Sequence, residues 1–312
     1  MKKVLNVKLY NLKKTKGAWY AGAFEQNGAL IKEFVFRKRG ESFTISDNNI
    51  VLYHNFKYSK SFKTIIWGGF VLPHYGHFLL ESLTRYNAII KTTVPILFFS
   101  KSNTIPSWVD EIFEILGISN RIVIIPQDCV VHVENFTISR AGYELETDFY
   151  TQEFFESLKL YNHKNDSYLY KRIWLSRAKL KKRYIIDEDL LEKRLLNLGW
   201  IIVSPEMLSV KEQVSIFTSA HRVAGFIGSA FHSVILAKSI SAKLDLFLLT
   251  ENININYTNI AKAKKLNQSI HDIGLRSITG EKFNKSTWEI SSFSINKILD
   301  ILSIENSATT KK

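Results

Sequence analysis

The second half of the chain alternates short apolar runs with helical patterns, and this alternation constrains the fold more than any other feature of the sequence. Strand-like runs occupy 168–176, 200–204, 221–228 and 243–250. Helical patterns occupy 187–198, 209–220 and 229–240. Strands that alternate with helices in this way pair in parallel, with helices on both faces of the sheet. The pattern predicts a doubly wound α/β domain, in which ligands bind at the carboxyl ends of the strands.

Capping residues support these helix boundaries. Asp187 is expected to be an N-cap, and Gly199 fits the position just after the last helical residue. Ser209 and Glu212 form the S-x-x-E pattern of a capping box. Glu212 therefore has a structural role that competes with any catalytic one.

The first half contains the same kinds of element in a less regular order. Short strands are predicted at 3–10 and 30–37, where they would form an edge or a small cap. A buried strand is predicted at 64–72, and Pro73 then opens a helix that continues to Ile90. The alternation continues with a strand, a helix and two more strands, at 95–100, 107–117, 121–126 and 130–138.

These patterns divide the 312 residues into three parts. An N-terminal lobe is predicted at 1–160, followed by a polar linker at 161–167 that lacks periodicity. A second lobe is predicted at 168–285. The remaining 286–312 would form a helix and a frayed tail, and this helix is expected to pack on the N-terminal lobe.

Composition limits the partners and the compartment. The chain has 42 basic and 29 acidic residues, and a net charge of +13 attracts nucleotides, nucleic acid or an acidic membrane surface. A single cysteine, Cys129, excludes an intramolecular disulfide and a cysteine-cluster metal site, and in its apolar run we expect it to be buried. No uncharged apolar run reaches the roughly 18 residues that span a bilayer. The start, MKKVLNVKLY, is interrupted by Lys8 and does not resemble a signal peptide, so we expect a cytoplasmic protein.

The helix predicted after Pro73 carries two opposite stripes at about 100° per residue. The core side would carry four large side chains, Leu79, Leu83, Tyr86 and Ile90. The other side carries ionisable groups, His74, His77, Glu81 and Arg85. One interpretation is a solvated face with a His77–Glu81 pair. A second is an active-site wall, where a carboxylate tunes an imidazole that accepts a proton from a hydroxyl. A zinc site is a third, although the sequence offers no clear third ligand nearby.

A basic turn follows the first strand of the second half. Seven Lys and Arg residues lie between Lys171 and Arg183, and Arg177 would project just past the end of the strand. A guanidinium at that position can hold two phosphate oxygens, and lysines such as Lys182 add positive potential. Taken alone, the turn favours a solvated basic loop.

A glycine-serine turn lies about fifty residues later in the chain. Gly228 would let the backbone turn sharply into a helix headed by Ser229. The N–H groups of its first turn, from about Ala230 to His232, would bind an anion. The segment matches neither the dinucleotide fingerprint nor the Walker P-loop, so neither a nicotinamide enzyme nor an ATPase is indicated. Together, the two turns predict a diphosphate site.

Four sequence blocks resemble, in order, the motifs of glycosyltransferase family 61. They are HYGHFLLESLTR (74–85), RIWLSRAKLKKR (172–183), GWIIVSPEMLSVKEQVSIF (199–217) and VAGFIGSAFHS (223–233). The resemblance implies a GT-B fold, with two Rossmann-like, doubly wound lobes facing across a cleft. It also implies inverting transfer, with no cofactor and no obligatory metal. Thr84 and Ser233 depart from the common Pro and Asn of the family, which leaves the donor and acceptor identities open.

The resemblance also assigns roles to the candidate residues. The nucleotide-sugar donor would be bound by Arg177, Lys182, Glu206, Gly228, Ser229, Ala230 and His232. The catalytic group would be His77, Glu81 and His74, with His77 or Glu81 as the base and Arg85 as an orienting residue. Bacterial family members sit among capsular and surface-polysaccharide genes.

We therefore expect a hexosyl- or pentosyltransferase. It would move a sugar from a nucleotide-sugar, UDP-linked donor to an oligosaccharide or lipid-linked glycan acceptor, in the cytoplasm or at the inner face of the membrane. The alternative is a basic protein that binds nucleic acid or another polyanion without catalysis. This alternative predicts a strongly salt-dependent affinity, but the chain shows no recognisable nucleic-acid module.

Overall fold

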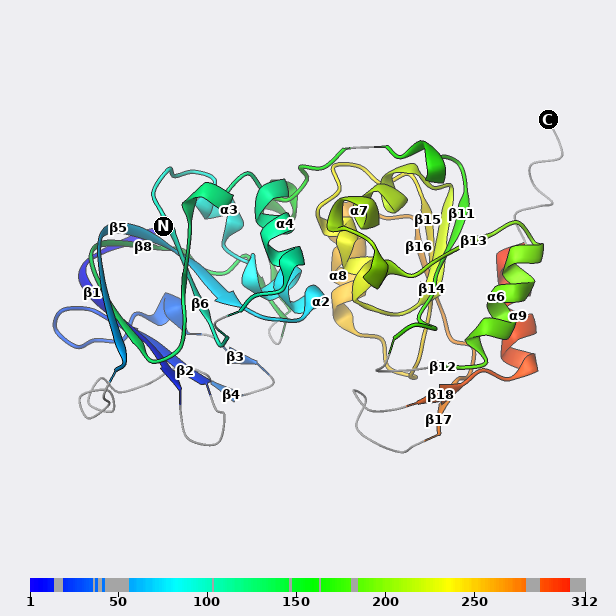
Figure 1. Ribbon diagram of the computed structural model, residues 1–312, viewed down its shortest axis with the longest axis horizontal. Helices are drawn as coiled ribbons and strands as arrows, with labels where there is room; N and C mark the ends of the chain where they lie inside the picture. The colour runs from blue at the N-terminus through cyan, green and yellow to red at the C-terminus, as the bar shows by residue number, and fades with distance from the viewer. Residues whose placement is uncertain are drawn as a thin grey trace. The chain divides into compact units, whose positions relative to one another are not determined.

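The chain folds into two units, Met1–Leu160 and Tyr161–Lys312, in a computed structural model (Figure 1). The structure describes residues 1–13, 19–35, 37–38, 41–42, 56–102, 104–145, 148–162, 164–180, 185–278 and 287–303. Within these ranges, no helix combines the length and the apolar composition that crossing a bilayer requires.

The second unit is built around a five-stranded parallel sheet. Its strands lie in the order β13 (Ile201–Val203), β11 (Arg172–Leu175), β14 (Arg222–Phe226), β15 (Lys243–Phe247) and β16 (Gln268–His271). Every neighbouring pair is parallel. Figure 1 shows α7 (Val210–Ser219) and α8 (Ile255–Lys264) on one face of this sheet, and α6 (Glu188–Asn197) and α9 (Ser292–Ser303) on the other. The doubly wound α/β prediction is therefore confirmed for this unit.

The strand order locates a switch point in this sheet. From one edge of the sheet to the other, the strands are the second, first, third, fourth and fifth of this sheet along the chain. The winding direction therefore reverses between β11 and β14. Ligands of open α/β sheets bind outside the carboxyl ends of the two strands at such a point. Arg177 follows β11 and Gly228 follows β14, so both predicted phosphate turns begin at this position.

The described part of the second unit also contains three short strands and three 3₁₀ turns. A small sheet joins β12 (Ile185–Ile186), β18 (Trp288–Glu289) and β17 (Arg276–Ser277). The 3₁₀ turns are η6 (Asp166–Tyr168), η7 (Pro205–Met207) and η8 (Ser229–Ile235). The Ser209–Glu212 capping box is confirmed, and Gly199 adopts the positive φ of 77° expected after α6. Asp187 occupies the N-cap position of α6, as predicted, but its backbone is left-handed (φ 65°) and its side chain makes no capping hydrogen bond.

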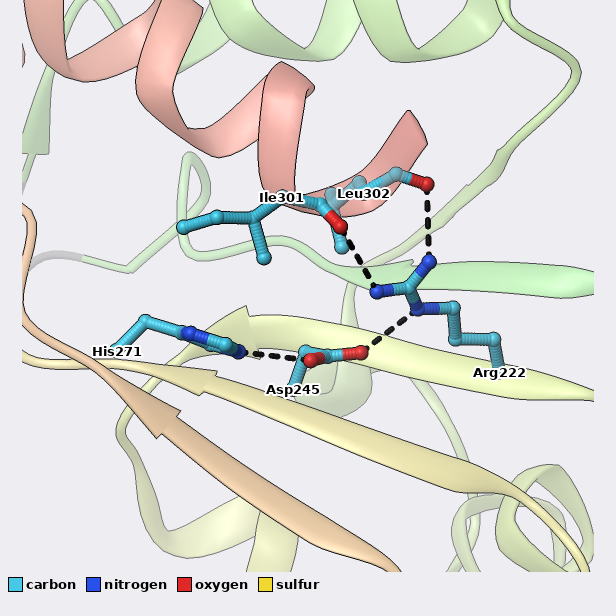
Figure 2. Close-up of polar contacts among 5 residues, drawn as sticks. All are labelled: Arg222, Asp245, His271, Ile301 and Leu302. Atoms are coloured by element: carbon cyan, nitrogen blue, oxygen red, sulfur yellow. Dashed lines mark hydrogen bonds and ion pairs between the residues drawn. The ribbon is translucent and has the colours of Figure 1, made fainter. Parts of the chain in front are cut away.

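Helix α9 differs from its prediction. The sequence suggested that the last helix packs on the N-terminal lobe, but α9 belongs to the second unit. Buried Arg222 donates hydrogen bonds to the carbonyl oxygens of Ile301 and Leu302 in its last turn (Figure 2). Its apolar stripe, which includes Ile298 and Leu302, is buried. A buried guanidinium requires acceptors, and the unsatisfied carbonyls at a helix end supply them.

The first unit contains a mixed six-stranded sheet. The order is β2 (Trp19–Phe24), β1 (Lys2–Lys13), β8 (Cys129–Ile138), β5 (Tyr58–Val71), β6 (Ile96–Ser100) and β7 (Ile122–Ile125). The last four strands are parallel, whereas β1 is antiparallel to both of its neighbours. A switch point lies between β5 and β8, because β5 comes first in the chain among the parallel strands and β8 comes last.

Two predictions for the start of the chain are wrong. Strand β1 lies between β2 and β8, so it is an interior strand and not an edge. The strand predicted at 30–37 is instead a 3₁₀ turn, η2 (Lys32–Phe34), followed by β3 (Arg37–Lys38) and its partner β4 (Glu41–Ser42). Phe34 is fully buried and its ring lies 4.4 Å from that of Trp67. The packing of Phe34 in the core accompanies the 3₁₀ turn, in place of the strand that the local sequence pattern suggested. Cys129 is buried, as predicted.

The helix predicted at 74–90 is broken into three pieces. They are α2 (Tyr75–His77), a π-helical turn η3 (Phe78–Ser82) and α3 (Tyr86–Ile89). The part of this unit that the structure describes also contains α4 (Ser107–Ile115), η4 (Ser119–Arg121) and α5 (Gln152–Ser157), and β9 (Tyr143–Glu144) pairs with β10 (Phe149–Tyr150). The wheel of about 100° per residue does not apply through a π turn, which closes i to i+5. Ile90, predicted in the core, is accordingly 47% exposed.

Candidate active site

Arg177 lies at the carboxyl end of β11 with its side chain directed at the end of β14. The side chain is buried, and Nη1 lies 3.5 Å from the carbonyl oxygen of Ile227. The backbone around Arg177 is fixed on both sides, since Ser176 N donates to Val203 O of β13 and Leu180 N donates to Arg177 O. The two turns predicted from the sequence to form one phosphate site therefore touch each other at the switch point.

Gly228 is the residue that makes this contact sterically possible. A Cβ added at Gly228 would lie 2.6 Å from Arg177 Nη1, closer than any real side chain approaches. Its φ of −169° is ordinary extended backbone, so the need for glycine is close approach and not conformation. The guanidinium therefore packs directly on the backbone that enters η8.

The element after Gly228 is shorter and tighter than the predicted helix at 229–240. It is a 3₁₀ helix of seven residues, and Phe231 N already donates to Gly228 O. The predicted long helix is therefore wrong, whereas anion binding by its first turn stays a prediction. Ser229 and Ala230 are half-buried beside Arg177, whereas His232 is buried, with its ring 4.9 Å from that of Tyr257 in α8.

The remaining donor-side candidates lie at the same edge or outside the described residues. Glu206 is exposed in η7, directly after β13, so three neighbouring strand ends carry candidates. Lys182 lies outside the described residues.

Glu188, an acidic residue in the first turn of α6 that the sequence analysis did not single out, lies beneath the Arg177 turn. Its Oε1 accepts hydrogen bonds from Arg177 N at 3.1 Å and from the indole Nε1 of Trp174 at 3.2 Å. The residue is 1% exposed. A sequence signal existed, because positions 188, 191 and 195 share one helical stripe and the other two are the buried Leu191 and Leu195.

Burial changes the protonation of this carboxyl group. Desolvation raises the pKa of Glu188 to about 7, and the nearby charge of Glu192 acts in the same direction. The hydrogen bonds from Arg177 N and Trp174, together with the charge of Arg177, act against this shift. Glu188 therefore changes charge near neutral pH.

This shift predicts a pH-dependent gain in stability for Glu188→Gln. A carboxyl whose folded pKa is raised favours folding below its unfolded pKa, and the advantage is lost as the pH rises through about 7. The glutamine does not titrate, so its stability relative to the native protein should rise by up to about 3 kcal/mol between pH 4 and pH 8. Urea unfolding across this range, with exposed Asp189→Asn as the control, measures the difference. A difference that stays constant with pH would contradict the assignment.

In the first unit, the turn after β5 brings His77 and Glu81 together. His77 Nδ1 is hydrogen-bonded to Glu81 Oε1, and their side chains are 30% and 10% exposed. Because the carboxylate accepts, Nδ1 carries the proton and Nε2 is the basic nitrogen. The π turn packs closely on β5, since Ser82 Oγ accepts from Leu72 N and Ser82 O lies 3.0 Å from the Cβ position of Gly69.

His74 and Arg85 are the other two residues of the predicted ionisable stripe, and they differ from this pair in their burial. His74 is exposed, and its ring is 4.8 Å from that of His77. Arg85 is buried and donates to the carbonyl oxygens of Ser139 and Glu33, so it is not on the ionisable face. Burial lowers the pKa of Arg85 to about 10, which leaves it charged at neutral pH. The predicted orienting role of Arg85 toward His77 is therefore wrong at the level of direct contact, because the π turn changes the direction of residue 85.

Among the described residues, no three side chains of His, Cys, Asp or Glu gather closely enough to hold a metal ion.

The sequence model of one protein family, described as glycosyltransferase 61, matches residues 75–242, which is more than half of the chain. The chain belongs to glycosyltransferase family 61. A search of curated proteins gives no match. Among solved structures, the iron-containing dodecameric glycosyltransferase TibC from enterotoxigenic E. coli H10407 is similar, with 10% identity, 78% of this chain and 73% of that chain covered, and a TM-score of 0.34.

Both clusters of this family 61 glycosyltransferase lie inside the matched range. His77 and Glu81 fall near its start, and Arg177 and Gly228 fall in its second half. His74 precedes it by one residue. The family match therefore covers the part of the chain that carries both clusters.

Proposed function

We propose that this family 61 chain is an inverting, metal-independent glycosyltransferase that uses a nucleotide-sugar donor, UDP-linked, and a hydroxyl acceptor on a growing surface polysaccharide. The observation that carries the proposal is the contact between Arg177 and the Ile227–Gly228 backbone at the switch point of the second unit. A buried guanidinium at the carboxyl ends of two adjacent strands is placed where a ligand diphosphate enters an open α/β sheet.

On the donor side, the leaving group is a nucleoside diphosphate with growing negative charge. Arg177 would stabilise this charge with its fixed donors, and the Ser229–Ala230 backbone would add dipoles beside it. Glu206, His232 and Lys182 complete the proposed set, with Glu206 facing the nucleotide. Positive charge supplied by the chain itself supports transfer without an obligatory metal.

On the acceptor side, His77 would act as the general base. Its Nε2 takes the proton of the acceptor hydroxyl as the oxygen attacks the anomeric carbon and the bond from that carbon to the diphosphate oxygen breaks. Attack opposite the leaving group inverts the anomeric centre. Glu81, bonded to Nδ1, would hold the imidazole and stabilise the imidazolium that forms. The hydrogen bond supports His77 over Glu81 as the base.

We extend the proposal to the GT-B arrangement, with the acceptor on the first unit and the donor on the second. The acceptor would be an oligosaccharide or a lipid-linked glycan, and the enzyme would work in the cytoplasm, with peripheral contact at the inner membrane through its net charge of +13. The transferred sugar would be a hexose or a pentose.

The direct test is release of free nucleotide from a panel of nucleotide-sugars. Purified protein is incubated with each donor with and without a glycan acceptor, in the presence and absence of a chelator. One donor should release nucleotide in an acceptor-dependent way and give a product of inverted anomeric configuration. A protein that binds polyanions in a salt-dependent way but releases no nucleotide from any donor would contradict the proposal.

Replacing Arg177 is expected to remove the main stabilisation of the leaving group. Arg177→Met should lower kcat/KM by about 10²-fold, and Arg177→Lys should recover only part of it, because a lysine cannot present the planar fork. Steady-state kinetics with the active donor measures both. The matched control is Arg172→Met at the amino end of the same strand, where the guanidinium bonds Leu198 O and activity should stay near the native value. Equal losses in both variants would point to strand stability instead.

A further inference from the structure

A buried carboxylate under the Arg177 turn is the feature that the proposed mechanism leaves unused. Glu188 Oε1 accepts both the backbone N–H of Arg177 and the indole N–H of Trp174. The second oxygen, Oε2, is buried and has no hydrogen-bond partner among the residues that the structure describes. A buried carboxylate oxygen without a partner is costly to the fold, so core stability is a poor account of this acid.

The hydrogen bonds of Glu188 connect Trp174 to the backbone of Arg177. Trp174 is fully buried against the rings of Phe226 and Phe247, with centroids 5.3 and 5.8 Å away, so the position of its indole in the sheet is fixed. Glu188 links this indole to the backbone nitrogen of Arg177. The direction in which Arg177 leaves the strand is thereby set by the carboxylate of α6.

This link reaches the phosphate position through the side chain of Arg177. Ser176 N is tied to Val203 O on one side, and Arg177 Nη1 approaches Ile227 O and the glycine backbone on the other. A small rotation of the Arg177 backbone would move the guanidinium away from Gly228, because a long side chain amplifies a change at its base.

We infer that Glu188 is a positioning residue of the donor site, which sets the Arg177 turn so that the guanidinium meets the diphosphate of a nucleoside-diphosphate donor. The inference rests on the proposed function. It assigns to α6 a role in donor binding, carried by a hydrogen-bond acceptor that does not touch the ligand. Burial raises the pKa of Glu188, which agrees with a carboxyl group that is kept in the interior although its burial is unfavourable.

The test compares three changes at Glu188, with UDP as the probe. Glu188→Leu removes the acceptor, Glu188→Asp keeps a carboxylate that is one methylene too short to reach both donors, and Glu188→Gln keeps an acceptor oxygen at the native distance. We expect the Kd for UDP at pH 7.5 to rise about 10- to 100-fold for Leu, as for a lost hydrogen bond that leaves a buried donor unsatisfied. The Asp variant should lie between, and the Gln variant should stay within about 3-fold of native.

Kinetics separates positioning from general destabilisation. The donor KM should rise with the Kd in the Leu and Asp variants, whereas kcat at saturating donor should change by less than about 3-fold, because the bound donor restores the turn. A merely structural acid would lower the melting temperature without changing KM or Kd in the folded fraction. Asp189→Asn, an exposed change in the same helical turn, should match the native protein in every readout.

The outcomes distinguish this inference from the proposal beneath it. If the Leu variant does not fold, the contrast between the Asp and Gln variants decides. Native binding of UDP, lost in Arg177→Met but equal in all Glu188 variants, overturns the positioning role and leaves the proposed function intact. Absence of binding of UDP and of the other common nucleoside diphosphates to the native protein overturns both.

Discussion

Replacing His77 with alanine is expected to lower the rate of glycosyl transfer by about 10²- to 10⁴-fold, the range found when a general base is removed. The native imidazole is partly exposed and its Nδ1 is engaged by Glu81, so Nε2 is the nitrogen that can accept the acceptor proton. The alanine variant should bind UDP normally, because the residues proposed to bind the donor lie in the second unit. Single-turnover transfer and UDP affinity, measured on the same preparation, test both statements.

The companion change is Glu81→Gln. An amide oxygen can still accept from Nδ1, but it carries no charge to stabilise the imidazolium, so an intermediate loss of about 10- to 100-fold is expected. The control is His132→Ala, which removes a half-buried histidine from β8 of the same unit and should leave transfer unchanged. Near-native turnover in His77→Ala would reject His77 as the base. A larger loss in Glu81→Gln than in His77→Ala would move that role to Glu81.

The two clusters differ in how well the sequence could predict them. Arg177 and Gly228 follow strands whose pattern is local, and the alternation of strands and helices fixes which ends share a sheet edge. Their contact is therefore foreseeable from order alone. Glu188 was missed because an acid at the start of a helix is normally a first-turn residue, and its burial depends on how α6 packs on the sheet.

The side-chain directions in the segment after β5 could be predicted only in part. His77 and Glu81 are four residues apart, and a turn of α-helix or π-helix brings such residues together, so their pairing was foreseeable. Arg85 comes after the π turn, where each residue advances the chain by a smaller angle, and it faces the interior instead. The π turn itself arises from tertiary packing, which includes the bond from Leu72 N to Ser82 Oγ and the glycine bulge in β5. No local pattern in the sequence reports these contacts.

Family membership and geometry carry different parts of the functional argument. The family supplies the class of reaction, and the roles proposed for single residues rest on the geometry. An acid–base pair at the switch point of the first sheet and a guanidinium at the switch point of the second are chemically distinct. One suits a proton transfer and the other suits an anionic leaving group, which is the division of labour that glycosyl transfer to a hydroxyl requires.

A buried network in the second unit fixes the last helix. Arg222 Nε donates to Asp245 Oδ2 at 2.7 Å, and His271 Nε2 bonds the other carboxylate oxygen at 2.7 Å (Figure 2). Arg222 and Asp245 are each 1% exposed. Burial alone would raise the pKa of Asp245, but the hydrogen bonds from His271 and Arg222 outweigh it and hold the pKa below its ordinary value. The carboxylate is therefore charged at neutral pH and depends on Arg222 for compensation.

Arg222→Met is expected to destabilise the second unit by about 3–5 kcal/mol, since it removes the guanidinium that compensates the buried Asp245 carboxylate and frees the carbonyls of Ile301 and Leu302. For a unit of this size the midpoint of thermal unfolding should fall by roughly 10 °C or more. The double variant Arg222→Met/Asp245→Asn removes the charge as well, and it should be more stable than the single variant. The control is Arg194→Met, which removes an exposed guanidinium of α6 that is bonded to Asn296 of α9. It should shift the midpoint by less than about 2 °C. If the single and double variants unfold at the same temperature, the charge of Asp245 is not the cause of the lost stability.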